Sequence, residues 1–177
     1  VFVAEAADAS AQIFNVPGGT MTFTDVDSTS LITNISLVQA SLFLPGQGGP
    51  IAPDPVMMAA LTAAYGNALS VSNASFTPSG GGGTLVNALQ FNSLPANLDF
   101  LPATGALRLE YTVVVSDGET PSNPITRLVL IEGSNDGPQA ADDLHITTEN
   151  MPVAVVAANG VLSNDTDPDL RDTLSVT

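Results

Sequence analysis

Closely spaced acidic residues are the side chains of this sequence most able to do chemistry. Asp25 and Asp27 stand one residue apart near the start, and Asp165, Asp167 and Asp169 repeat that spacing near the end. Carboxylates this close repel one another, and keeping several ionised together is costly unless a cation lies among them. Ca²⁺ suits such a cluster because it takes about six to eight oxygen ligands, whereas zinc favours cysteine and histidine. The spacing therefore predicts a calcium site, although Asp-rich turns also cap solvated loops without a metal.

Two further features extend this predicted site. The pair Asn135-Asp136 adds an amide carbonyl and a carboxylate beside a junction in the chain, and the acidic run at 165–169 could close the same cage. The chain also contains a short internal similarity: Glu5 precedes the acidic run at 25–27 much as Glu149 precedes the run at 165–169. The expected metal ligands are Glu5, Asp25, Asp27, Asn135, Asp136, Glu149, Asp165, Asp167 and Asp169.

The charge balance excludes two classes of partner. The 177 residues include 18 Asp and Glu against 3 Arg, with no lysine, which gives a net charge of −15. Nucleic-acid phosphates and anionic membrane surfaces are bound through clusters of Lys and Arg, and this chain has none. The sequence also has no apolar run near the roughly 20 residues that span a bilayer. We expect neither a nucleic-acid partner nor membrane insertion.

Catalysis is not expected either. The chain has no cysteine and a single histidine, His145, which lies in a strand-like run. No Gly-x-Ser-x-Gly elbow is present, and the glycine run near residue 80 cannot be a phosphate loop because no lysine follows it. The pair Asp142-Asp143 does not provide glycosidase geometry, because neighbours on a strand face opposite ways.

The apolar pattern predicts an all-β fold with one inserted helix. Residues 107–116 alternate with a period of two, with Leu107 and Tyr111 on the apolar face, and residues 125–131 follow a turn as the hairpin partner. Asp54-Pro55 offers a cap and a first helical residue for a helix over 56–69, whose methionines and Tyr65 we expect to pack in the core. Further strands are expected at 12–16, 21–24, 31–38, 71–76 and 85–91.

Turn-forming residues at 133–138 mark a domain boundary. A predicted strand ends there, a new strand-like run begins at His145, and half of the acidic residues follow Ile131. We therefore expect a domain at 1–137 and the opening strands of a second, incomplete β domain at 138–177. The second lacks the strands that would close a sandwich, so the fragment is expected to end within a domain.

Four segments resemble the VCBS repeat of large bacterial surface proteins, especially RTX-type adhesins. They are GTMTFTDVD at 19–27, NLDFL at 97–101, LRLEYTVVVSDG at 107–118 and GSNDGP at 133–138. The later pieces ADD at 141–143, Glu149 and SNDTDPD at 163–169 are similar to the opening of a bacterial cadherin-like tandem repeat. The resemblance implies immunoglobulin-like β-sandwich domains along an extracellular stalk, with Ca²⁺ at junctions where Asn-Asp meets Asp-x-Asp of the next domain.

The expected function is that of a secreted structural spacer at the bacterial cell surface, made rigid by calcium, in an adhesin or matrix protein. Its partners would be neighbouring repeats of the same chain, with a glycan or protein ligand bound elsewhere in the full chain. Two alternatives remain open. One is a filament subunit in which strand edges such as 152–157 are completed by an identical subunit. The other is a carbohydrate-binding module, although the chain has no tryptophan and two tyrosines.

Overall fold

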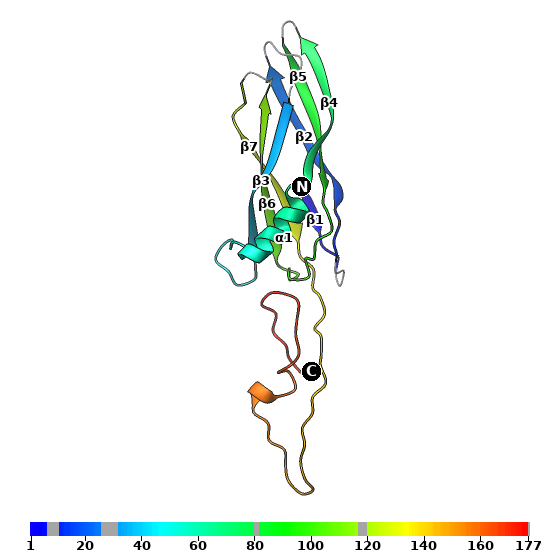
Figure 1. Ribbon diagram of the computed structural model, residues 1–177, viewed down its shortest axis with the longest axis vertical. Helices are drawn as coiled ribbons and strands as arrows, with labels where there is room; N and C mark the ends of the chain where they lie inside the picture. The colour runs from blue at the N-terminus through cyan, green and yellow to red at the C-terminus, as the bar shows by residue number, and fades with distance from the viewer. Residues whose placement is uncertain (7–10, 26–31, 80–81, 117–119, 177) are drawn as a thin grey trace.

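The computed structural model describes residues 1–6, 11–25, 32–79, 82–116 and 120–176. Within these ranges, a four-stranded sheet has the order β1-β7-β6-β3 and a three-stranded sheet the order β2-β5-β4. The two sheets form an elongated sandwich, and the helix α1 lies at its lower end (Figure 1). The predicted all-β sandwich with one inserted helix is confirmed. The elements are β1 (Phe2–Ala4), β2 (Asn15–Asp25), β3 (Ile32–Phe43), α1 (Pro55–Tyr65), β4 (Leu69–Ser79), β5 (Gly82–Asn92), β6 (Ala106–Ser116) and β7 (Ile125–Glu132).

Strand β6 confirms the alternation seen in the sequence. Every second residue from Leu107 to Val115 is buried, and the residues between them are partly exposed. Strand β6 pairs antiparallel with β7, as the expected hairpin requires, and with β3 on its other side. Because β6 is flanked on both edges, its apolar face becomes the centre of the core.

Strand β1 joins this sheet differently, since it pairs parallel to β7. Val3 lies opposite Ile131, and the Glu5 N–H continues the ladder by donating to the Glu132 carbonyl at 2.9 Å. This pairing places the chain start beside the end of β7. It is the topological feature on which the site described below depends.

Two expected strands proved to be one. The end of the run at 12–16 and the whole run at 21–24 belong to the continuous β2, which begins at Asn15 and whose register with β5 shifts between Pro17 and Gly19. Gly19 has a φ of +89°, a conformation that glycine adopts without strain, so a bulge carries the strand past this point. The proline and glycines at 17–19 predicted the end of a strand, but they form a bulge within one strand.

The helix begins where the sequence predicted and ends earlier. Asp54 Oδ1 accepts from the N–H groups of Val56 and Met57 at 2.8 and 2.9 Å. The helix stops at Tyr65 rather than at residue 69, because Leu69 starts β4 and the Ala68 carbonyl accepts from Asn92 N–H. Tyr65 is fully buried, stacks on Phe91 and accepts a 2.6 Å hydrogen bond from the Tyr111 hydroxyl at its carbonyl, so its packing role is confirmed.

Residues 138–176, here called the C-terminal segment, contain no strand. The segment runs down from the base of the sandwich and turns back toward it (Figure 1). It holds one bridge, between Gln139 and Thr166, and the short 3-10 helix η1 (Ala157–Asn159). The strands expected at the run beginning at His145 and at 152–157 were therefore wrong, because the one bridge of this segment does not extend into a ladder in the described residues. No helix in the described ranges is long and apolar enough to cross a membrane.

Candidate metal centre

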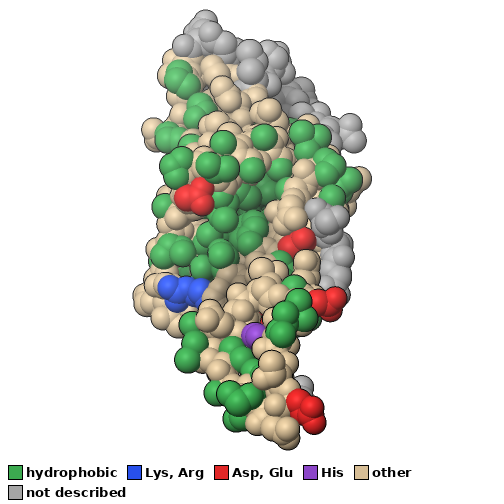
Figure 2. All heavy atoms as spheres, turned by 60° about the horizontal axis from the view of Figure 1, so that its bottom comes forward, with side chains coloured by type: hydrophobic (Ala, Val, Ile, Leu, Met, Phe, Trp, Pro, Cys, Tyr) green, Lys and Arg blue, Asp and Glu red, His purple; other side chains and the backbone are tan. Residues whose placement is uncertain are grey.

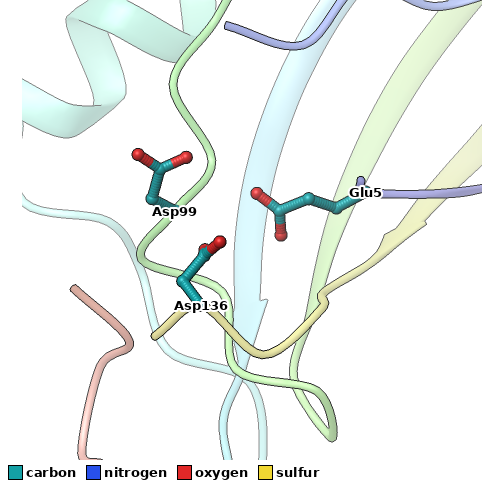
Figure 3. A group of neighbouring side chains, drawn as sticks. All are labelled: Glu5, Asp99 and Asp136. Atoms are coloured by element: carbon teal, nitrogen blue, oxygen red, sulfur yellow. The ribbon is translucent and has the colours of Figure 1, made fainter. Parts of the chain in front are cut away.

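Three carboxylates from distant parts of the sequence meet at the base of the sandwich. Glu5 follows β1, Asp99 lies between β5 and β6, and Asp136 follows β7. Each offers an oxygen within 4.8 Å of the others. Figure 3 shows the three side chains arising from separate segments and gathering in one region. Glu5 is only 7 % exposed and Asp136 only 2 % exposed, so these charges are largely removed from water.

The backbone around the cluster is fixed by close packing. Leu98 and Leu101, on either side of Asp99, are fully buried in the core. A Cβ atom at Gly133 would collide with the carbonyl oxygens of Leu101 and Pro102. Glycine at 133 therefore lets the chain leaving β7 pass directly against the segment that carries Asp99. The parallel β1–β7 pairing then brings Glu5 to the same place.

A fourth carboxylate reaches the cluster from the C-terminal segment. Asp169 Oδ2 accepts a hydrogen bond from the Asp136 N–H at 2.9 Å, and the Asp169 side chain is 3 % exposed. The next residue, Leu170, donates its N–H to the Phe100 carbonyl at 3.1 Å and packs against the core. The C-terminal segment is thus docked on the base of the sandwich at the acidic cluster.

Three of these carboxylates share one pattern of hydrogen bonding. One oxygen of each accepts from a nearby N–H: Glu5 Oε2 from Ser134 at 3.3 Å, Asp99 Oδ2 from the Asn97 amide at 2.9 Å, and Asp169 Oδ2 from Asp136. The other oxygen of each, Glu5 Oε1, Asp99 Oδ1 and Asp169 Oδ1, is buried without a hydrogen-bond partner. A buried carboxylate oxygen without a partner is costly, and a bound cation would remove that cost.

The electrostatics of the site point the same way. Burial raises the pKa of Glu5 from 4.5 to about 8; the Asp136, Asp99 and Asp169 carboxylates contribute to the increase, and the Ser134 N–H opposes it. Burial also raises the pKa of Asp169, with contributions from Asp136 and two other aspartates. A positive ion among these groups would reverse both effects, because it favours the charged form.

A second acidic group lies beside the first. Asp167, Asp169 and Asp172 each offer an oxygen within 4.8 Å of the others, and Asp167 Oδ1 accepts from the Asp169 N–H at 3.0 Å. Asp169 therefore belongs to this group and touches the first through Asp136. The donors in both groups are oxygen atoms, and His145, the single histidine of the chain, lies in an exposed stretch. These acidic clusters could hold a metal ion.

The residues expected as ligands are placed as follows. Glu5, Asp136 and Asp169 come together, and Asp167 lies in the second group. Asp165 instead accepts from Ala141 N–H at 2.8 Å, Asn135 donates its side-chain amide to the Asp136 carbonyl at 2.8 Å, and Glu149 is exposed in a turn. Asp25 is the last residue of β2 and its side chain lies outside the described part, as does the whole of Asp27.

Sequence reasoning missed Asp99 and Asp172 as site residues. The motif NLDFL at 97–101 was noticed as a resemblance, but its aspartate was not connected with the metal. A usable signal was the Asn-x-Asp spacing, because Asn97 can form an Asx turn and hold the following carboxylate. The structure forms that turn, with Asp99 N–H donating to Asn97 Oδ1 at 3.0 Å.

Fold and site together define a β-sandwich with a buried acidic base that suits a metal ion. Comparison with known proteins adds no family to this description. No protein-family model matches the chain, and no curated protein matches it.

Proposed function

We propose that this chain is a structural extracellular repeat module that Ca²⁺ makes rigid at its base. The observation that carries the proposal is the set of buried, unpartnered oxygens on Glu5, Asp99 and Asp169. Ca²⁺ accepts several carboxylate oxygens in a flexible arrangement. Mg²⁺ demands a near-ideal octahedron and keeps several waters, and zinc prefers nitrogen and sulfur ligands.

The ion would join two parts of the chain. Glu5, Asp99 and Asp136 belong to the sandwich, whereas Asp169 belongs to the C-terminal segment. A cation held by both would neutralise their repulsion and fix the direction in which the chain leaves the sandwich. Extracellular modules bind calcium with dissociation constants of about 10⁻⁴–10⁻³ M, which suits a site that fills outside the cell.

Such a junction fits a spacer in a bacterial surface adhesin or matrix protein, as the VCBS-like and cadherin-like motifs suggest. Neighbouring repeats of the same chain would be its partners. Asp25 and Asp27 would serve the corresponding junction with a preceding repeat.

The test is a calcium titration followed by thermal melting and small-angle scattering. An ion present at 100 times its dissociation constant adds about 2.7 kcal/mol to the free energy of unfolding, so the melting midpoint should rise. Scattering should show a longer maximum dimension on binding. Asp136→Asn should lose both responses. Asp143→Asn, an exposed aspartate of neither acidic group, should keep them. Equal melting curves with calcium and with chelator would refute the metal site.

One observation favours a second candidate function, a filament subunit completed by strand exchange. In the C-terminal segment, the run MPVAVV at 151–156 is apolar yet exposed, with Met151 at 63 % and Val156 at 67 %. The run is not a strand in the structure, but it could become one by adding to the sheet edge of an identical subunit. Light scattering at high protein concentration in calcium distinguishes the two, because a spacer stays monodisperse and a filament subunit grows with concentration.

A further inference from the structure

A cavity of about 390 Å³ lies between α1 and the segment that leads from β5 to the acidic base. Small-molecule sites in proteins have volumes of about 300–1,000 Å³, so the cavity is large enough for a ligand. We call it the helix cavity. Its walls include Met57, Ala60 and Leu61 of α1, and Leu94, Ala96 and Phe100 of the facing segment.

The lining is apolar with one polar exception. The exception is Asn97, whose amide is held by two hydrogen bonds with Asp99. The Asn97 amide nitrogen carries a second hydrogen beyond the one given to Asp99, so it retains one donor that a ligand acceptor could use. An apolar cavity with one fixed polar group is the usual composition of a small-molecule site.

The surface around the helix cavity is also unusual. Helix α1 has no charged residue, although the chain carries a net charge of −15. A surface helix normally has a polar outer face, yet Val56 of α1 is 81 % exposed and Leu94 on the opposite wall is 64 % exposed. Figure 2 shows a broad area of hydrophobic side chains with few acidic ones among them on one face of the molecule. A contiguous apolar surface beside a cavity is consistent with a binding site.

We propose that the helix cavity binds a small neutral apolar molecule. Its walls contain no carboxylate to pair with a cation, and no cationic group to pair with an anion. The negative chain and the Asp99 carboxylate beside Asn97 disfavour anionic amphiphiles. This proposal does not require the metal, because no residue of the cavity wall is one of the proposed metal ligands, although Asn97 and Phe100 flank Asp99.

The test uses two fluorescent probes with the same rings and different charge. N-phenyl-1-naphthylamine is neutral, and 1-anilinonaphthalene-8-sulfonate adds a sulfonate. The neutral probe should bind saturably at one site per chain, at least tenfold more tightly than the anionic one. Ala60→Trp, which adds a large side chain to the cavity wall, should weaken the neutral probe at least tenfold. Ala59→Trp is the matched control, because Ala59 is exposed on the same helix outside the cavity lining, and it should bind as the parent does.

Each measurement is made in calcium and in chelator. Probe binding to the cavity can then be interpreted even if calcium has no effect on the protein. Leu94→Asp provides a second blocking variant at an exposed position, should Ala60→Trp fail to fold. Equal binding by the parent and a folded blocking variant overturns the proposal, and so does tighter binding of the anionic probe. A dimer in solution that Ala60→Trp dissociates would assign the cavity to a second copy and also overturn it.

Discussion

Replacing Glu5 by glutamine should change the stability of the protein in opposite directions with and without calcium. In chelator at pH 8, the buried Glu5 carboxylate destabilises the fold. Glutamine has nearly the same size as glutamate but carries no charge, so it removes this cost. In saturating calcium, the same carboxylate would be a ligand of the proposed site, and glutamine would remove one negative oxygen from it. The variant should therefore be more stable than the parent without calcium and less stable with it.

The size of the effect follows from the pKa of Glu5. Because the folded-state pKa of this carboxyl is raised from 4.5 to about 8, the folded protein holds its proton more tightly than the unfolded chain does. Its contribution to stability is complete below pH 4.5 and is lost as the pH rises to 8, at about 1.4 kcal/mol for each pH unit. The loss is at most about 5 kcal/mol, and Glu5→Gln should recover a large part of it. For a domain of this size, each 1 kcal/mol moves the melting midpoint by about 2–4 °C.

The assay is thermal melting of parent and variant at pH 5 and pH 8, in calcium and in a chelator that works at both. Without calcium, the parent should lose stability between the two pH values and the variant much less. At pH 5 the two proteins should melt within a few degrees of each other. If the variant is no more stable than the parent in chelator at pH 8, the buried-charge reasoning is wrong. If calcium stabilises both equally, Glu5 is not a ligand.

Three further predictions follow from single contacts. Asn97→Ala removes the donor to Asp99 Oδ2, so calorimetry should show calcium affinity falling roughly tenfold, and an unchanged affinity would contradict the positioning role. Asp169→Ala should weaken calcium binding and speed proteolytic release of the C-terminal segment in calcium; release at the parent's rate would show that the segment docks without the ion. Tyr111→Phe removes the hydrogen bond to the Tyr65 carbonyl and should cost about 1 kcal/mol in urea unfolding at unchanged calcium affinity; loss of affinity would mean that this contact shapes the site.

The parts of the fold that the sequence predicted are those with a local signal. Strand β6 follows from its alternation, and α1 begins at its Asp54 cap, because both patterns lie within a few neighbouring residues. The glycine bulge in β2 and the early end of α1 were missed, since each depends on which distant strand the chain pairs with.

The same division holds for the site. The acidic runs and Asn135-Asp136 indicated a metal, but the meeting of Glu5, Asp99 and Asp136 depends on the parallel pairing of β1 with β7. No spacing along the chain encodes that pairing. Asp99 is held by its local Asn-x-Asp turn, but only the packing of its loop against Gly133 brings it to the other carboxylates, whereas Glu149, which repeats the spacing of Glu5, lies exposed in a turn.

The stretch from Asn97 to Leu101 has a consequence for how the two proposed sites communicate. Phe100 lines the helix cavity and accepts from Leu170, and Asp99, its neighbour, faces the acidic base. One short piece of backbone therefore borders both the helix cavity and the acidic cluster. Suppose that a bound apolar molecule and the ion favour the same backbone geometry. Thermodynamic linkage then requires each to increase the binding affinity of the other by the same factor. If the ion is calcium, as we propose, the calcium concentration around the protein would then set how firmly an apolar guest is retained.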